Sequence, residues 1–124
     1  MKVVCLKLLD ARGDEVDSSP WATLDAEYIV LALEAAPGGR VQLRIIGDDG
    51  PTPVLFESEM FMTTSSDIPS NWVVSIGENG LFDLAPAKWL RTGFWEDYFN
   101  GDAQAIAEFE EEKNKIYAEA GVKV

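Results

Sequence analysis

The sequence predicts an α+β protein, in which a bent antiparallel sheet or a partly open small β-barrel is followed by C-terminal helices. Two observations support this class. Before Pro86, short apolar runs alternate with turns rich in Gly, Pro and Asp, and after it the apolar residues follow a helical period. The chain has 124 residues and no linker-like segment. We therefore expect a single domain, residues 1–124, that is mainly β over residues 1–85 and helical over residues 86–121.

Two strands are expected in the first third of the chain. Residues 2–9 form an apolar run that predicts the first strand, and the polar residues 10–20 predict a loop. Residues 27–33 are apolar on both alternate sets. This pattern is typical of a central strand that is buried on both faces.

Residues 40–45 show a clean alternation of polar and apolar side chains after a Pro-Gly-Gly turn at residues 37–39. Together with residues 27–33 they predict a hairpin. One face should be buried and the other exposed, because successive side chains of a strand point to opposite faces. The inward set is Val41, Leu43 and Ile45, and the outward set is Arg40, Gln42 and Arg44.

The middle of the chain contains one ambiguous segment and one clear hairpin. Residues 54–62 fit a strand, and they equally fit a short helical turn over residues 57–60. The apolar residues 72–76 and 81–84 flank Asn79 and Gly80. Asn-Gly between two apolar runs predicts a tight type I′ turn, in which both central residues adopt positive φ.

Three helices are expected after the strands. Pro86 suits the first turn of a short helix that ends at Leu90, and Thr92 can cap a second helix that ends at Phe99. Asp102 can cap the last helix, which should run to about residue 120 because Gly121 is a typical stop. The expected apolar stripe on this helix, interrupted by Lys113, consists of Ile106, Phe109, Ile116, Tyr117 and Ala120.

The composition excludes several kinds of chemistry. There is no histidine and one cysteine, Cys5, so neither a Ser-His-Asp nor a Cys-His catalytic site can form, and an internal disulfide is impossible. A zinc site would lack its usual ligands. The acidic turns at residues 14–17 and 48–50 lack the spacing of a calcium-binding loop. We expect no metal and no cofactor.

Carboxylate pairs are the remaining source of catalysis. Glu57 with Glu59, or Glu96 with Asp97, would supply the acid and base of a small hydrolase. However, adjacent acids on a helix point in different directions, and acids two apart on a strand share one solvated face. With 22 Asp and Glu in the chain, such pairs also arise by chance. We therefore expect no catalytic residues.

The net charge of −12 is the most unusual property of the sequence. It disfavours nucleic acid and anionic membranes as partners, and it attracts basic proteins. An equally simple interpretation is that the acidity serves only solubility. The N-terminus does not resemble a signal peptide, and no apolar stretch is long enough for a membrane helix. A cytoplasmic protein is expected.

An aromatic cluster and an acidic helix face are the candidate binding features near the C-terminus. Trp89, Phe94, Trp95, Tyr98 and Phe99 are close in sequence. They can anchor the sheet, or Tyr98 or Trp95 can stay partly exposed as an interface anchor. Residues 108–112 give an acidic face, either simply solvated or a docking surface, on which Glu111 can pair with Lys115. The candidate partner-binding residues are Glu57, Glu59, Glu96, Asp97, Tyr98, Glu108, Glu110, Glu111 and Glu112.

Two segments resemble known families. Residues 21–56, with the Asp48-Asp49-Gly50 turn and the aromatic Phe56 at the end of a strand, resemble small SH3-like barrels. Residues 86–102, with the run from Gly93 to Asp102, are similar to small acidic bacterial immunity proteins of contact-dependent growth inhibition and related polymorphic toxin systems. This resemblance implies a protein that binds and blocks a toxin.

Three functions are consistent with these observations. The first is an immunity protein whose acids cover the basic active site of a toxin domain. The second is a regulatory or structural interaction module without a toxin partner. The third is a small carboxylate-dependent hydrolase, which would require two convergent carboxylates in a deep cleft.

Overall fold

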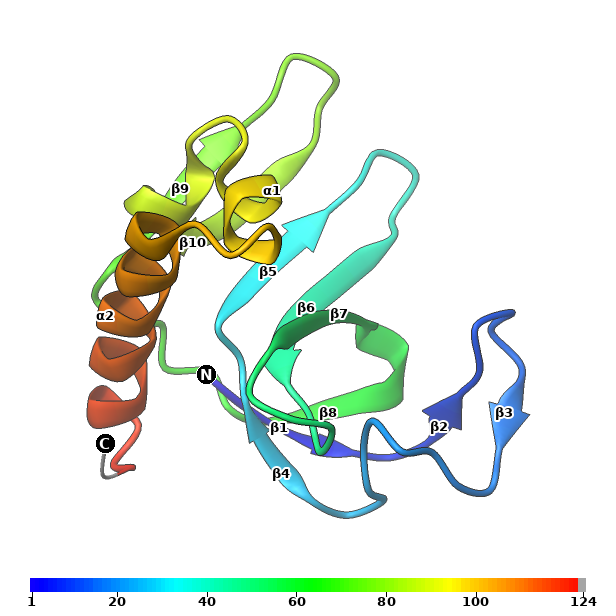
Figure 1. The fold of residues 1–124 in the computed structure, drawn as a ribbon. Helices are drawn as coiled ribbons and strands as arrows, with labels where there is room; N and C mark the ends of the chain where they lie inside the picture. The colour runs from blue at the N-terminus through cyan, green and yellow to red at the C-terminus, as the bar shows by residue number, and fades with distance from the viewer. Residues whose placement is uncertain (123–124) are drawn as a thin grey trace.

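The computed structural model describes residues 1–122 and confirms the α+β class. Its strands form antiparallel sheets that are not closed into a barrel, and the two α-helices follow the last strand (Figure 1). A three-stranded sheet has the order β4–β1–β8, in which β4 is Glu27–Ile29, β1 is Lys2–Cys5 and β8 is Phe61–Ser65.

The larger sheet has five strands in the order β7–β6–β5–β10–β9. All of its neighbouring strands are antiparallel. The strands are β7 (Pro53–Glu57), β6 (Val41–Ile46), β5 (Ala32–Ala35), β10 (Phe82–Pro86) and β9 (Trp72–Ile76).

The remaining elements are a short ribbon and the helices. Strands β2 (Leu8–Leu9) and β3 (Glu15–Val16) form a two-stranded ribbon. The 3₁₀ helices are η1 (Ser58–Met60) and η2 (Ala87–Leu90), and the α-helices are α1 (Phe94–Phe99) and α2 (Ala103–Glu119). No helix in the described part of the chain is both long and apolar enough to cross a membrane.

The first two predicted strands are each divided in the structure. Residues 2–9 give β1 and β2, and residues 27–33 give β4 and the start of β5, in two different sheets. The break falls at Val30 and Leu31, both of which are fully buried. The predicted burial holds for Tyr28 and residues 30–32, whereas Glu27 is exposed, and the single continuous strand was wrong. The predicted loop over residues 10–20 also contains β3.

The hairpin of β5 and β6 is confirmed, with one correction to its outer face. Leu43 and Ile45 are buried as predicted, whereas Arg44 is buried as well, with 7% of its surface exposed. The prediction that Arg44 points into solvent was wrong because Trp95 of α1 covers it. The guanidinium lies 3.8 Å from the centre of the Trp95 ring and 3.6 Å from the carboxylate of Glu34.

Charge and burial oppose one another around Arg44. Its surroundings lower the pKa of Arg44 to about 10, mainly through desolvation and against the charges of Glu34 and Asp83. Glu34 and Asp83 are direct neighbours across β5 and β10. Burial, together with the charge of Glu34, raises the pKa of Asp83. Arg44 is thus the cation between two carboxylates that would otherwise repel each other.

The ambiguous segment and the second hairpin are resolved by the structure. Residues 53–65 run as a strand, a short 3₁₀ turn and another strand, so both descriptions of this segment apply in part. The β9–β10 hairpin is present, but its turn is not type I′. Gly80 has φ of +82°, whereas Asn79 does not have positive φ. The N–H of Gly80 donates to Gly77 O, as in a type I turn followed by a left-handed residue.

The predicted capping residues are confirmed for α2 but not for α1. Asp102 caps α2 by accepting a hydrogen bond from the N–H of Ala105 at 2.9 Å, and Gly121 has positive φ just after the helix. Thr92 does not cap α1, because Gly93 occupies the N-cap without a side-chain bond. Ile106 is exposed, in contrast to the prediction. The buried positions on α2 are Ala105, Phe109, Glu112 and Ile116.

The aromatic cluster is mainly part of the core. Trp89 and Phe94 are almost completely buried, and Trp89 stacks on Phe109 of α2 with ring centres 5.0 Å apart. Trp95 and Tyr98 are half-buried, and only Phe99 is largely exposed among the five. The cluster therefore fixes the helices to each other and to the five-stranded sheet.

Replacing Arg44 with Met should lower the free energy of unfolding by about 2 to 3 kcal/mol at neutral pH, because Glu34 and Asp83 lose their shared cation. Since the pKa of Asp83 is raised, the folded state takes up protons at higher pH than the unfolded state. The loss of unfolding free energy caused by Arg44→Met should therefore become smaller as the pH falls towards about 4. Denaturant unfolding at both pH values measures this, with Arg44→Lys as the charge-retaining control. An equal deficit at both pH values would contradict the electrostatic account.

Replacing Gly80 with Val should destabilise the protein by about 1 kcal/mol or more, because a β-branched residue resists positive φ. In addition, a Cβ at this position would lie 3.3 Å from Cγ of Pro37. The matched control is Glu78→Val in the same turn, where φ is not positive. Thermal or denaturant unfolding of both variants is the measurement. Equal stability of the two variants would argue against a backbone effect.

Candidate functional site

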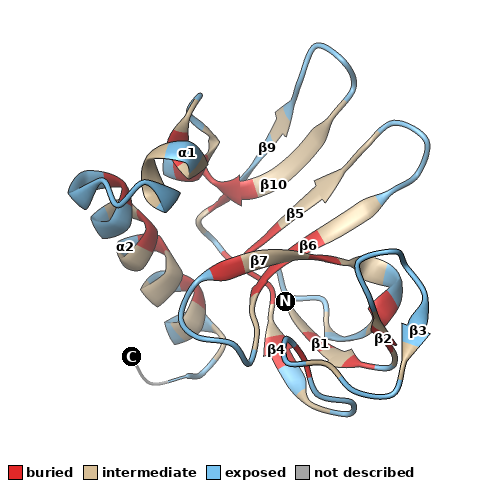
Figure 2. Cartoon of the chain, turned by 45° about the vertical axis from the view of Figure 1, so that its right-hand side comes forward, coloured by how far each residue is buried: buried red, intermediate tan, exposed pale blue. Residues whose placement is uncertain are grey.

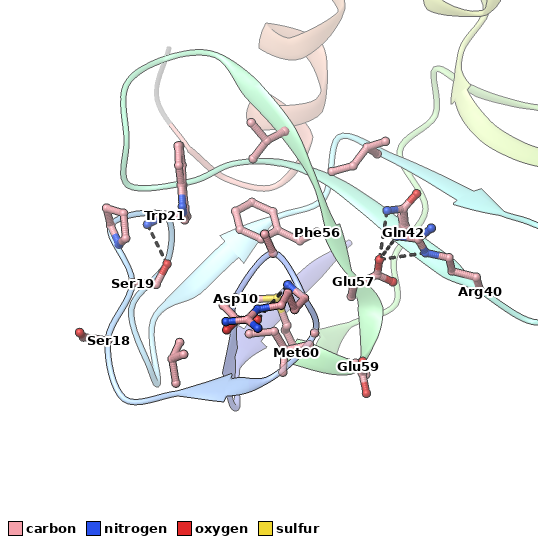
Figure 3. Close-up of a pocket in the computed structure, with 18 residues that line it drawn as sticks. Asp10, Ser18, Ser19, Trp21, Arg40, Gln42, Phe56, Glu57, Glu59 and Met60 are labelled. Carbon is pink, nitrogen blue, oxygen red and sulfur yellow. Dashed lines mark hydrogen bonds and ion pairs between the residues drawn. The ribbon is translucent and has the colours of Figure 1, made fainter.

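A groove lies between the β2–β3 ribbon and strand β7, which forms one edge of the five-stranded sheet (Figure 3). Its volume is about 770 Å³. The lining is apolar in the middle and polar towards the ends. It includes Leu9, Asp10, Arg12, Val16, Ser19, Trp21, Arg40, Gln42, Val54, Leu55, Phe56, Glu57, Glu59 and Met60.

Trp21 is the most prominent aromatic side chain of the groove, and 47% of its surface is exposed. Its backbone is fixed against the end of β6, because the N–H of Asp48 donates to Trp21 O at 2.8 Å. This close approach depends on Gly47. A Cβ at Gly47 would lie 2.3 Å from Trp21 O and 3.1 Å from Phe56 Cζ. The sequence therefore places a glycine where the backbone of the Trp21 loop crosses the sheet.

A second set of hydrogen bonds holds the same loop. The hydroxyl of Tyr28 donates to Asp48 Oδ1 at 2.9 Å and accepts from the N–H of Thr23 at 2.8 Å. Thr23 Oγ1 donates to Asp48 Oδ2 at 2.6 Å. Burial, followed by the contacts with Asp48, raises the pKa of Tyr28, which keeps the phenol protonated as a donor. The exposed Trp21 is thus carried by a rigid support.

At one polar end of the groove, the carboxylate of Glu57 accepts hydrogen bonds from two side chains. Glu57 Oε1 accepts from Arg40 Nε at 2.9 Å and from Gln42 Nε2 at 3.2 Å, and Arg40 Nη2 also contacts it. The hydrogen bond from Arg40 lowers the pKa of Glu57, although partial burial acts in the opposite direction. Glu57 is therefore held ionised near neutral pH. A group in that state is poorly suited to act as a general acid.

The two carboxylate pairs considered for hydrolysis do not converge. Glu57 points to Arg40 and Gln42, while Glu59 points away from it (Figure 3) and lies 3.5 Å from Lys7 Nζ. On α1, Asp97 is paired with Arg91 at 3.0 Å. Neither arrangement places two carboxylates across a substrate-sized gap, as a glycosidase requires.

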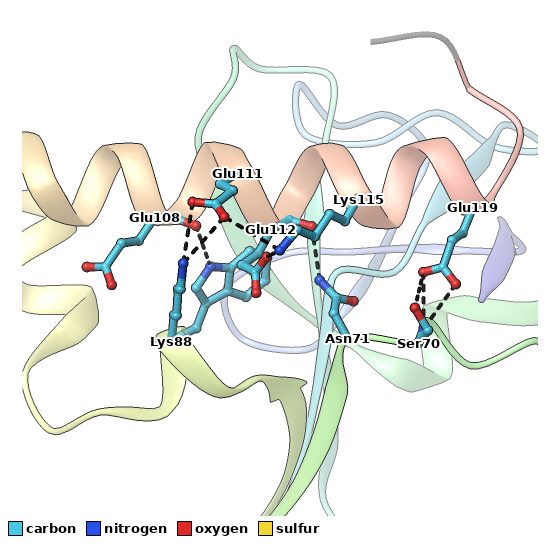
Figure 4. A network of polar contacts seen from close by, with 9 residues as sticks. Ser70, Asn71, Lys88, Glu108, Glu111, Glu112, Lys115 and Glu119 are labelled. Carbon is cyan, nitrogen blue, oxygen red and sulfur yellow. Dashed lines mark hydrogen bonds and ion pairs between the residues drawn. The ribbon is translucent and has the colours of Figure 1, made fainter.

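Glu111 and Glu112 of α2 form an ion-pair network with basic side chains of the same chain (Figure 4). Glu111 lies 3.4 Å from Lys88 and 3.5 Å from Lys115, so the predicted Glu111–Lys115 pair is present. The hydrogen bond from Lys88 is the main cause that lowers the pKa of Glu111. Glu112 is buried, with its Oε2 2.8 Å from Lys115 Nζ. The network ties α2 to η2 and reduces the charge that this face presents to a partner.

Three other predicted residues also have contacts within the fold. Glu110 pairs with Lys113 at 2.6 Å, and the backbone oxygen of Glu108 accepts from Trp89 Nε1 at 3.4 Å. Oε1 of Glu108 is buried without a hydrogen-bond partner within the described residues. Tyr98 packs on Phe109, with ring centres 4.9 Å apart. Burial, and then the charge of Glu110, raises the pKa of Tyr98.

The structure divides the predicted partner-binding residues between two regions. Glu57 and Glu59 line the groove, whereas Glu96, Asp97 and Tyr98 lie on α1 and residues 108–112 lie on α2. Sequence reasoning missed Trp21 and the β2–β3 ribbon as parts of a site. Gly47, which follows a strand and precedes two acids, was the available signal of a close backbone approach.

No group of three or more Cys, Asp or Glu side chains within residues 1–122 is arranged to hold a metal ion. Comparisons of the chain with protein-family models, with curated proteins and with solved structures give no match. The interpretation of the site therefore depends on its geometry and charge.

Replacing Gly47 with Ala should destabilise the protein by about 2 kcal/mol or more, because the new methyl group overlaps Trp21 O and the backbone must move. Gly77→Ala is the matched control, since Gly77 also lacks positive φ and its nearest contact would be the side chain of Asn79 at 3.3 Å. Denaturant unfolding compares the two. A similar, small loss of unfolding free energy in both variants would show that the Trp21 loop moves easily to accommodate the added methyl group.

Proposed function

We propose that this chain is an immunity protein that binds a basic toxin domain in the cytoplasm and covers the active site of that toxin. The binding region in this proposal is the groove surface, defined as the groove lining together with Asp14, Glu15 and Asp17 of the adjoining ribbon and loop. Its partner would present basic side chains around an apolar one. Binding, rather than catalysis, is the proposed activity.

The observation that carries the proposal is the distribution of compensated and uncompensated charge. Seven basic side chains within residues 1–122 form ion pairs with acids of the same chain. Most of these pairs lie on the helices and the large sheet. Within the described residues, no ion pair involves Asp14, Glu15 or Asp17, which are exposed beside the groove. Asp14, Glu15 and Asp17 thus contribute uncompensated negative charge beside the groove, in a chain with a net charge of −12.

An aromatic anchor accompanies this charge. Trp21 is half exposed and rests on a fixed support, whereas Tyr98 is held in the aromatic core. Interface hot spots are enriched in tryptophan and tyrosine that lose their remaining contact with water on binding. Truncating Tyr98 would also disturb the core packing. Trp21 is therefore the better candidate for a binding anchor.

The first step of the test is affinity capture of the tagged protein from its native cells, followed by identification of the bound proteins. A captured nuclease-like or otherwise basic domain supports the proposal. If every captured protein is acidic, the electrostatic basis is wrong. If the partner is basic but is not a toxin, the chain is an interaction module instead of an immunity protein.

Neutralising Asp14, Glu15 and Asp17 to Asn, Gln and Asn should slow association with the captured partner several-fold and flatten its salt dependence. The comparison variant is Glu96→Gln with Glu108→Gln, which removes acids from the helices instead. Surface plasmon resonance across a range of salt gives both rate constants. If only the helix variant slows association, the partner binds the helices, and the groove surface is not the site.

The anchor is tested in the same experiment through the other rate constant. Trp21→Ala should raise the dissociation rate about ten-fold or more and leave the salt dependence of association unchanged. Leu24→Ala is the control, because Leu24 is similarly exposed, at 43%, and lies outside the groove lining. Equal effects of the two substitutions would contradict the role of Trp21.

A further inference from the structure

Strand β9 is an edge strand of the five-stranded sheet, and it lacks the features that normally protect such an edge. Its sequence, Trp-Val-Val-Ser-Ile, contains no charge and no proline, and its pairing with β10 runs over all five residues without a register shift. Two of its side chains are very exposed, Val74 at 59% and Ile76 at 72%. Exposed, flat and apolar edges promote strand pairing between chains.

The alternation of hydrogen-bonded and non-bonded residue pairs between β9 and β10 shows which backbone groups of β9 point away from β10. The N–H of Gly77 donates to Leu81 O at 2.7 Å, so this pair belongs to the bonded set. Bonded and non-bonded pairs alternate along an antiparallel ladder. The N–H and C=O groups of Val73 and Ser75 therefore face β10, while those of Val74 and Ile76 face the open side. Pro86, which has no N–H, lies opposite Trp72 in a non-bonded pair.

The exposed side chains of β9 continue an apolar face across the sheet. The cross-strand register places Val74, Leu84, Leu33 and Leu43 in one row, and Ile76, Phe82, Ala35 and Val41 in the next. The outer ends of the two hairpins that carry these rows are intermediate or exposed, whereas their inner ends are buried (Figure 2). A strand added beside β9 would extend both rows.

The other sheet edges in the described part of the chain are protected, except β2, which is only two residues long. Edge strand β7 carries Pro53 and Glu57, and β4 carries Glu27. The pairing of β8 with β1 has a register shift, and β3 carries Glu15. Charge, proline and irregular pairing are the usual means by which edges are kept apart. Among the described edge strands longer than two residues, β9 is the one that lacks all three.

We propose that two copies of this chain associate through β9, antiparallel, around a two-fold axis at Val74. In this register the outward-facing groups meet: Val74 lies opposite Val74 of the second copy, Trp72 opposite Ile76, and Val73 opposite Ser75. The N–H groups of Val74 and Ile76 donate across the interface. The N–H of Trp72 is already bonded to Pro69 O. The result is one continuous sheet with extended apolar rows.

Charge identifies the second copy as the occupant. A partner recruited through electrostatic attraction would be expected to meet acids on the strand, yet β9 has no charged residue in a chain with a net charge of −12. In the two-fold register every facing pair is uncharged, so no like charges come into contact. The remaining repulsion acts between the rest of the two copies and is screened by salt.

Sedimentation velocity of the purified chain tests the proposal, over concentrations from about 1 to about 200 μM. The mass should rise from 13.7 kDa towards twice that value, and more readily at high salt. Val74→Lys should weaken the dimer at least ten-fold. Met62→Lys is the matched control, because Met62 is 52% exposed on the edge strand β8 and should leave the dimer unchanged.

Val74→Pro separates backbone pairing from side-chain contact. The N–H of Val74 faces away from β10, so its loss should leave the unfolding free energy nearly unchanged while the dimer is lost. A wild-type chain that stays monomeric at every concentration and salt overturns the proposal. A dimer that Val74→Lys does not weaken, or that Met62→Lys weakens equally, also overturns it. These results are independent of whether the captured partner is a toxin.

Discussion

The fold depends on how the buried backbone at Val30 and Leu31 is satisfied. Here the chain passes from the three-stranded sheet to the five-stranded sheet, and both residues are fully buried. The N–H of Val30 donates to Met1 O at 3.0 Å, and that of Leu31 to Arg44 O at 2.8 Å. Leu31 O accepts from Trp72 Nε1 at 3.0 Å. Because an unpaired buried polar group costs about 1 to 3 kcal/mol, the N-terminus, β6 and β9 must all be in place for the two sheets to meet.

This dependence explains which features the sequence could predict. The α+β class, the two hairpins and the Asp102 cap follow from local sequence patterns and are confirmed, although the turn at Asn79 and Gly80 is not the predicted type I′. The break at Val30 and the burial of Arg44 follow from contacts with Met1 and Trp95, which are distant in the sequence. Periodicity reports only whether a side chain is apolar. It cannot show that a charged side chain is covered by an aromatic ring from another element.

The candidate site was predictable in part for the same reason. Glu57 and Glu59 were chosen for their charge, and both line the groove. The acids of α2 were chosen by the same criterion, yet Glu110, Glu111 and Glu112 pair with Lys113, Lys88 and Lys115 of the same chain. Charge density along a sequence therefore overestimates the field that a surface presents. The acids that remain without a basic partner can be identified only when the positions of the basic side chains are known.

The two proposed surfaces lie at opposite edges of one sheet. The groove runs beside β7, and the open edge is β9, with three strands between them. The β7 edge is closed to strand addition by proline, by charge and by the adjoining ribbon, so it is available for a partner that binds a groove. The β9 edge offers backbone groups and apolar rows without charge. Pairing at β9 would leave both grooves accessible at the outer ends of the continuous sheet. Salt should then weaken binding at the groove and strengthen pairing at β9, because one depends on attraction between opposite charges and the other is opposed by the like charge of the two copies.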